Sequence, residues 1–195
     1  MGRAKIGMLV LLTLFAVSLA LAEPAMAQDS ARGLYKIYSN LGRTVGGVCY
    51  DPHEGWNVGL GLSTAMPFTP KADAKLSEIV LGMFNNAGGD FARVSLNDDA
   101  NGLPGKAIHT WVVGKLGMYQ WHSCYVSIAK SRTGLPLKGG TQYWVVAVAP
   151  YTTWDVWQYT YNDIMGDFAY EKNNGGWNLE DSYLSAFGVF GTKLK

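Results

Sequence analysis

The segment from Tyr151 to Tyr161 holds the clearest candidate for ligand chemistry, because aromatic residues recur in it at alternate positions. In a β-strand, alternate side chains point to the same face of the sheet. One face would then carry three rings in a row, a flat apolar platform on which sugar rings can stack. The opposite face, with Trp154 and Val156, would serve the core. The candidate ligand-binding residues are Trp157, Tyr159, Tyr161 and Asp155.

The alternative for this segment is that the stripe starting at Trp157 is itself the core. Aromatic side chains bury large areas and dominate the interiors of many β proteins. Both stripes cannot face the same core, and this argument favours an exposed platform. We take Trp157 as the principal ligand contact, because a Trp ring offers the largest stacking surface.

Catalytic chemistry has less support. A glycoside hydrolase needs two carboxylates that face one cleft, and the acids available within or between the expected strands are Asp155, Asp163, Asp167 and Glu171. Acids at strand ends commonly form a solvated rim. The three His residues stand apart from any Gly-x-Ser-x-Gly or His-Glu-x-x-His motif. We therefore assign no catalytic residue and expect no cofactor.

A short polar segment resembles the first half of a calcium-binding loop. Asn97, Asp99 and Asn101 supply oxygen atoms at alternate positions, and Gly102 stands sixth. The twelfth position is Ile108, so the bidentate carboxylate that completes such loops is missing. The same residue types suit a tight turn, which is the interpretation we prefer, and no metal ligand is assigned.

The N-terminal residues have the pattern of a removable export signal. Arg3 and Lys5 are positively charged, Ile6 to Ala22 is almost entirely apolar, and Ala25-Met26-Ala27 places small residues where a signal peptidase reads them. Cleavage before Gln28 is expected. An earlier cut after Ala22 and an uncleaved membrane anchor are the alternatives, because the apolar run approaches the length of a membrane span.

Residues 28–195 form one domain by length and composition. The chain has 16 Lys and Arg and 15 Asp and Glu, and removing Arg3, Lys5 and Glu23 leaves these charges balanced. A basic nucleic-acid-binding protein is therefore not expected. The aromatic content of 13% excludes a disordered chain. We expect a soluble, exported domain, secreted or periplasmic, with no membrane span after signal cleavage. Its oligomeric state is open.

Export places Cys49 and Cys124 in an oxidising environment, where two cysteines can form a disulfide. Such a bond would contribute roughly 4 kcal/mol in the chain-entropy model if it were unstrained. The alternative is a pair of small buried side chains that never meet. We predict the bonded form.

The pattern of the remaining chain is that of short strands. Phe91 to Leu96 alternates apolar and polar residues, as in a half-buried strand, and Tyr143 to Ala149 is apolar on both faces, as in a central one. Further strands are expected at 34–38, 45–50, 107–113, 121–129, 154–161, 167–171 and 185–192. About ten strands separated by turns predict an all-β fold, a single jelly-roll-like antiparallel β-sandwich.

One segment conflicts with that pattern. Leu76, Ile79, Val80 and Met83 have helical spacing, although Gly82 and the β-branched residues disfavour a helix. An isolated helix in an all-β chain would also need its own packing partner.

Five motifs in fixed order carry a family resemblance. They are 37–42 (Ile-Tyr-Ser-Asn-Leu-Gly), 66–70 (Met-Pro-Phe-Thr-Pro) with Ala72, Asp73 and Leu76, 94–96 (Val-Ser-Leu) with 102–105 (Gly-Leu-Pro-Gly), 140–146 (Gly-Thr-Gln-Tyr-Trp-Val-Val) and 187–191. From Ile37 to Gly191 the chain resembles the bacterial choice-of-anchor R domain family of exported β-sandwich domains. The resemblance implies that Leu76 to Asn85 is a strand. It implies no catalytic residues. Family members often end in a sorting tail, a motif that the last five residues do not carry.

These observations together predict an exported, non-catalytic binding domain whose partner is a carbohydrate at or outside the cell envelope. The alternative from another class is a structural or adhesive envelope scaffold without a small ligand. A glycoside hydrolase ranks third.

Overall fold

The computed structural model describes residues 33–41, 55–118, 127–160 and 164–194. The predicted signal peptide, Cys49, Cys124 and Tyr161 lie outside these residues. The described residues form thirteen strands and no helix, and therefore no helix capable of spanning a membrane. The strands are β1 (Tyr35–Ser39), β2 (Gly55–Gly59), β3 (Leu62–Phe68), β4 (Ala74–Leu81), β5 (Met83–Ala87), β6 (Phe91–Asp99), β7 (Pro104–Gly114), β8 (Ser127–Leu137), β9 (Tyr143–Val148), β10 (Trp154–Gln158), β11 (Met165–Lys172), β12 (Trp177–Tyr183) and β13 (Phe187–Lys193).

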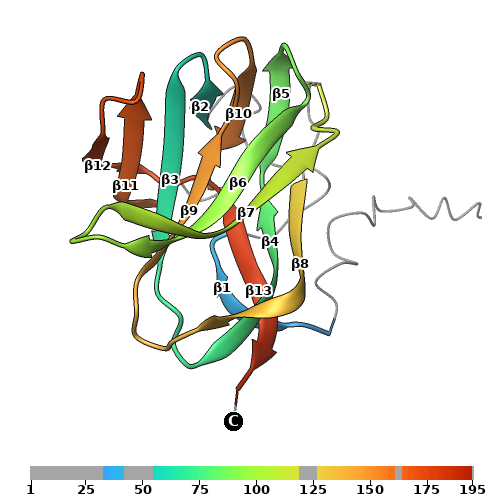
Figure 1. The fold of residues 1–195 in the computed structure, drawn as a ribbon, viewed down its shortest axis with the longest axis vertical. Helices are drawn as coiled ribbons and strands as arrows, with labels where there is room; N and C mark the ends of the chain where they lie inside the picture. The colour runs from blue at the N-terminus through green and yellow to red at the C-terminus, as the bar shows by residue number, and fades with distance from the viewer. Residues whose placement is uncertain (1–32, 42–54, 119–126, 161–163, 195) are drawn as a thin grey trace, which may run out of the picture.

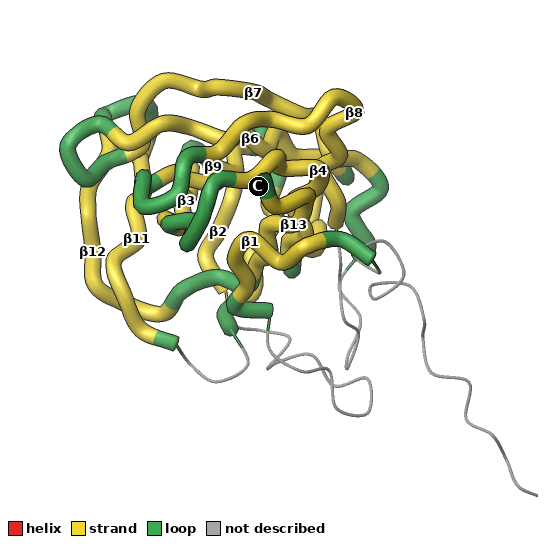
Figure 2. Tube along the Cα trace, turned by 90° about the horizontal axis from the view of Figure 1, so that it is seen from below, coloured by secondary structure: helices red, strands yellow, loops and turns green. Residues whose placement is uncertain are grey.

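The strands form two antiparallel sheets, which confirms the predicted all-β sandwich (Figure 1). The small sheet has the order β1-β13-β4-β8, and the large sheet has the order β5-β10-β2-β3-β9-β6-β7. A further hairpin of β11 and β12 joins the large sheet through β3. Figure 2 shows this hairpin at one side of the molecule, away from β4 and β8.

Strand β9 lies between β3 and β6 and is buried on both faces, as its apolar sequence predicted. Tyr143, Val145 and Ala147 face the main core between the sheets. Trp144 and Val146 face away from it, into a second apolar cluster on the outer face of the large sheet. Because both faces of β9 are covered, the outer face of the large sheet must carry a layer of side chains of its own. That layer positions the site described below.

The segment with helical spacing is extended, as the family resemblance implied, but it forms two strands. β4 pairs with β13 and β8 in the small sheet, whereas β5 pairs with β10 in the large sheet, and Gly82 joins them. In the pairing with β13, Leu76 and Glu78 lie opposite the consecutive residues Gly191 and Phe190, so a β-bulge at Ser77 interrupts the alternation. Leu76 and Ile79 therefore both face the core although they are three residues apart.

The β6–β7 hairpin is longer than the sheet it belongs to. Its outer part, residues 98–105, extends across β9 and β3 toward β11 and is called the hairpin arm below (Figure 1). Leu103 of the arm packs on the outer apolar cluster, whose buried members are Ala65, Trp144, Val146 and Ala169. The arm thus covers one end of the outer face.

Candidate functional site

Trp157, the predicted principal ligand contact, lies in the core. Its side chain is 0% exposed, its Nε1 donates a hydrogen bond to the carbonyl of Ala186 at 2.9 Å, and its ring meets Phe187 edge-on. The prediction that this ring faces solvent is therefore wrong. The alternation in β10 was predicted correctly, but the faces are reversed, since Trp154 is the ring that lies outside, at 39% exposure.

The other predicted platform residues do not form an exposed stripe either. Tyr159 is half-buried, with its ring edge-on to Trp56 at 5.5 Å and 5.3 Å from the ring of Tyr183. Asp155 is 0% exposed and accepts a hydrogen bond from Nδ2 of Asn85 at 2.8 Å. Tyr161 lies outside the described residues. In the part of the segment that the structure describes, no aromatic platform is present on β10.

The candidate hydrolase carboxylates do not meet in one cleft. Asp155 shares the inward face of β10 with Trp157, whereas Asp167 lines a hollow on the outer face of the large sheet. Glu171 is on the same face of β11 as Asp167, four residues further on. Asp163 is not among the described residues. The described acids therefore give no pair of catalytic carboxylates.

Residues 99–103, at the tip of the hairpin arm, form a turn. This is the interpretation that the sequence analysis preferred to a calcium-binding loop. Oδ2 of Asp99 accepts a hydrogen bond from the backbone N–H of Gly102 at 3.0 Å, and the N–H of Ala100 donates to the carbonyl of Leu103 at 2.8 Å. Asn101 and Gly102 have φ of 58° and 82°, the left-handed conformation that such turns need.

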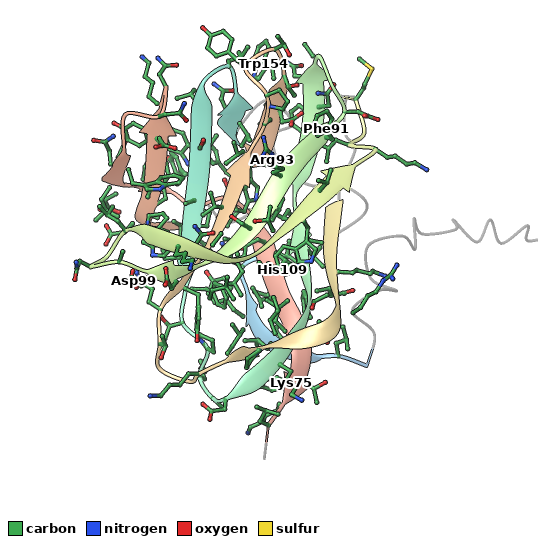
Figure 3. All side chains as sticks on the ribbon, viewed as in Figure 1. Lys75, Phe91, Arg93, Asp99, His109 and Trp154 are labelled. Atoms are coloured by element: carbon green, nitrogen blue, oxygen red, sulfur yellow. The ribbon has the colours of Figure 1, made fainter. Side chains whose placement is uncertain are left out.

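Asp99 also fastens the arm to the sheet beneath it. Its Oδ1 accepts hydrogen bonds from Nε1 of Trp144 at 2.8 Å and from Nε2 of Gln142 at 2.9 Å. Burial alone would raise the pKa of Asp99, but the bonds from Trp144, Gly102 and Gln142 outweigh it and lower the pKa below its usual value. Figure 3 labels Asp99 at the far end of the arm. The arm is therefore held by a carboxylate that stays ionised at neutral pH.

Among the described residues of the segment, Tyr151 has the most exposed aromatic ring, in the loop between β9 and β10. Its side chain is 72% exposed and lines a hollow of about 310 Å³. This volume is at the lower end of the range of about 300–1,000 Å³ for small-molecule sites. The other lining residues are Gly61, Leu62, Ser63, Val148, Ala149, Asn173 and Asn174. We call this place the tyrosine hollow.

The walls of the tyrosine hollow are joined by backbone hydrogen bonds between three loops. The N–H of Asn173 donates to the carbonyl of Gly61 at 2.7 Å, and the N–H of Leu60 donates to the carbonyl of Thr153 at 3.0 Å. Within the β9–β10 loop, the N–H of Thr153 donates to the carbonyl of Pro150 at 2.9 Å. The loops that carry Tyr151 and Asn173 are therefore positioned before any ligand arrives.

Gly61 makes room for the two side chains that define the tyrosine hollow. It has φ of 85°, and a Cβ at this position would lie 3.1 Å from Cε2 of Tyr151 and would clash with Oδ1 of Asn173. The aromatic ring and the amide therefore both lie against the Gly61 backbone. The result is a phenol ring beside amide groups that can donate and accept hydrogen bonds.

A second hollow of about 370 Å³ lies on the same face, beside the hairpin arm. Its lining residues are Pro67, Gly102, Gln142, Trp144, Asp167, Leu179 and Leu184. Leu179 is 50% exposed, whereas Trp144 is only 1% exposed and contributes structure rather than a stacking surface. We call this place the arm hollow.

The two hollows lie in line along the same pair of strands. Ser63 pairs with Val148 at the tyrosine hollow, and Pro67 pairs with Trp144 at the arm hollow. Four residues of a strand separate the two pairs, which corresponds to about 13 Å. Between them the outer face carries small side chains, including Ala65 and Ala169, against which Trp177 packs.

No protein-family model matches the chain, and no curated protein is similar to it. The similarity to the choice-of-anchor R family therefore stays a prediction from the sequence motifs. The class that the fold defines is an antiparallel β-sandwich domain with two neighbouring hollows on the outer face of its larger sheet.

Tyr151 lies inside the aromatic segment, but strand alternation does not single it out, because this residue precedes the strand. Pro150 and the pair Thr152-Thr153 around it were the available signal of a loop. An aromatic residue in a loop is less constrained to the core than one in a central strand.

Proposed function

We propose that this chain is an exported, non-catalytic binding domain whose ligand is a carbohydrate, bound on the outer face of the large sheet at the tyrosine hollow. The observation that carries the proposal is the ring of Tyr151, exposed by 72% at the edge of a hollow that has both apolar walls, such as Leu62 and Val148, and the amides of Asn173 and Asn174. A sugar needs both an apolar surface for its C–H groups and hydrogen-bonding groups for its hydroxyls, and this hollow has both.

The polar residues that line the tyrosine hollow favour a ligand without charge. Asn173 and Asn174 are exposed, have φ of 52° and 56°, and carry amides that donate and accept hydrogen bonds. No charged side chain lines this hollow. A hydroxyl-rich neutral molecule fits that lining better than an anion such as a phosphate, which would need Lys or Arg.

The presence of the arm hollow favours an oligosaccharide as the ligand, rather than a single sugar. It lies on the same two strands about 13 Å away and offers Leu179, Gln142 and Asp167. A chain of sugars that stacks on Tyr151 can continue along the outer face to these residues. We therefore expect longer oligosaccharides to bind more tightly than monosaccharides.

The test is a glycan array followed by titration of the best ligand against the mature chain and a Tyr151→Ala variant. We expect the variant to lose about 1–3 kcal/mol of binding free energy, by analogy with bases stacked on aromatic side chains. Its melting temperature should change little because the ring is mostly exposed. Tyr35→Ala is the matched control, since Tyr35 is 36% exposed on β1, in the other sheet.

Two results would overturn the proposal. One is a mature chain that retains no glycan on the array, which would leave the structural or adhesive scaffold as the function. The other is equal loss of binding in the Tyr151 and Tyr35 variants, which would remove the tyrosine hollow as the site. N-terminal sequencing of the exported protein tests the export part separately, and the expected first residue is Gln28.

A further inference from the structure

Ser63 places a hydroxyl without a partner on the floor of the tyrosine hollow. The residue is only 8% exposed, it lines the hollow, and its Oγ forms no hydrogen bond with the described residues. A buried hydroxyl that loses water and gains no protein partner is unfavourable. A ligand group that enters the hollow can supply this partner, and it can be a donor or an acceptor because a serine hydroxyl does both.

The neighbour of Ser63 on this floor is apolar. Val148 of β9 lies directly opposite Ser63 in the antiparallel pair, on the outer face of the large sheet, and also lines the hollow. Side chains directly opposite each other in such a pair have Cβ atoms about 4.5–5.5 Å apart. A ligand group that reaches Ser63 therefore also contacts Val148, where a ligand hydroxyl would find no hydrogen-bond partner.

Asn173 adds an acceptor at the rim above this floor. Its side chain lies against Gly61, because a Cβ at Gly61 would clash with Oδ1 of Asn173. Gly61 is two residues before Ser63 in the chain. Oδ1 of Asn173 accepts no hydrogen bond from the described residues, so it is open to a donor of the ligand. The hollow therefore combines a hydroxyl, an apolar surface and an amide oxygen.

We propose that the sugar in the tyrosine hollow carries an acetamido group, as N-acetylhexosamines do, and that Ser63 and Val148 select it. The inference rests on the proposed function and names the class of sugar that the same site takes. An acetamido group unites a carbonyl oxygen, a methyl group and an N–H. The carbonyl oxygen accepts a hydrogen bond from Ser63, the methyl group packs on Val148, and the N–H donates to Oδ1 of Asn173.

The other common groups at this position of a sugar fit the hollow less well. A hydroxyl can bond to Ser63, but it brings no methyl group to Val148. A free amine is protonated at neutral pH, and no carboxylate is among the residues that line the hollow. Burying a charge without a partner is costly. The acetamido group is neutral and avoids this cost.

The test compares three trimers that share one backbone linkage. They are triacetylchitotriose, its deacetylated form chitotriose, and cellotriose, in which hydroxyls replace the acetamido groups. Each is titrated calorimetrically into the mature chain. We expect the acetylated trimer to bind at least about tenfold more tightly than either of the others, a discrimination typical of a small apolar group in a pocket. Cellotriose that binds as tightly as the acetylated trimer would overturn the inference.

Two variants and a control assign the selection to the floor of the hollow. Ser63→Ala should weaken binding of the acetylated trimer about tenfold, the loss expected for one hydrogen bond, without lowering the melting temperature, because the hydroxyl has no partner in the fold. Val148→Thr replaces a methyl group with a hydroxyl and should narrow the affinity ratio between the acetylated trimer and cellotriose. Ser182→Ala, at a half-buried position of β12 outside both hollows, should change neither affinity. An affinity ratio that stays the same in both floor variants would contradict the proposal.

Failure of this inference differs from failure of the proposed function. If the glycans retained on the array lack acetamido groups and Tyr151→Ala still weakens their binding, the hollow is a glycan site and the inference is overturned. If the array retains no glycan, the proposed function is overturned and the inference falls with it.

Discussion

The indole N–H of Trp144 and the carboxylate of Asp99 form a 2.8 Å hydrogen bond that connects a central strand of the large sheet to the tip of the hairpin arm. Trp144 is 1% exposed, yet Asp99 is exposed to solvent. The bond therefore runs from a buried ring to a surface turn. It holds the arm over the outer face and so shapes the arm hollow.

Replacement of Asp99 should release the arm. In Asp99→Ala, the N–H groups of Trp144, Gln142 and Gly102 lose their common acceptor, so the turn at 99–103 should become cleavable in limited proteolysis at a dilution that leaves the wild type intact. Asp98→Ala, an exposed neighbour, is the control. Equal cleavage of all three proteins would contradict the prediction.

Acid should also release the hairpin arm of the wild-type protein. The pKa of Asp99 is lowered in the folded chain, so its stabilising contribution is present above the usual carboxylate pKa and is lost as pH falls through the lowered value. Protection of the arm should therefore persist at pH 5 to 7 and disappear only in strong acid. The Asp99→Ala variant should show no such loss, because its arm is already free.

Truncation of Trp157 should destabilise the whole domain. The ring is fully buried, packs on Phe187 and donates to Ala186, so Trp157→Ala should cost about 3–5 kcal/mol of unfolding free energy in denaturant titrations. Trp154→Ala, on the outer side of the same strand, should cost less than about 1 kcal/mol. Similar losses in the two variants would contradict the placement of these rings.

Replacement of Gln158 should stabilise the fold. Its Nε2 and Oε1 are buried and have no hydrogen-bond partner, and each such group costs about 1–3 kcal/mol. Gln158→Met keeps the length of the side chain and removes both polar atoms, so the unfolding free energy should rise. Gln142→Met is the control, because Gln142 donates to Asp99 and its loss should not stabilise. A destabilised Gln158 variant would refute the argument.

Asp155 should make the stability of the fold depend on pH. Its pKa is raised to about 6 in the folded chain, so the favourable contribution of its neutral form is complete below pH 4 and is lost as pH rises through 6. Asp155→Asn should therefore melt above the wild type at pH 8, whereas the two should converge at pH 4. A constant difference across this range would exclude titration of Asp155.

The local sequence pattern was sufficient to predict a strand and the burial of its faces wherever that strand is regular. Alternation in β6 and the two-sided apolar run in β9 correctly predicted a half-buried and a central strand, because side-chain direction in a strand has a period of two. In β4 that period fails at Ser77, since the bulge adds one residue relative to β13 and turns Leu76 and Ile79 to the same side. The bulge depends on pairing with β13, which is distant in the chain, so the local sequence shows only the spacing of a helix.

The sequence by itself determined that β10 has two different faces, one with Trp154 and Val156 and one with Trp157. Only the tertiary structure decided which face is inside. Alternation is a property of one strand, whereas burial depends on what packs against it, and here Phe187 of the small sheet covers Trp157. The same holds for the candidate site, because Gly61, Tyr151 and Asn173 belong to three separate loops. They meet because strands remote in sequence pair side by side and bring their turns to one end of the sandwich.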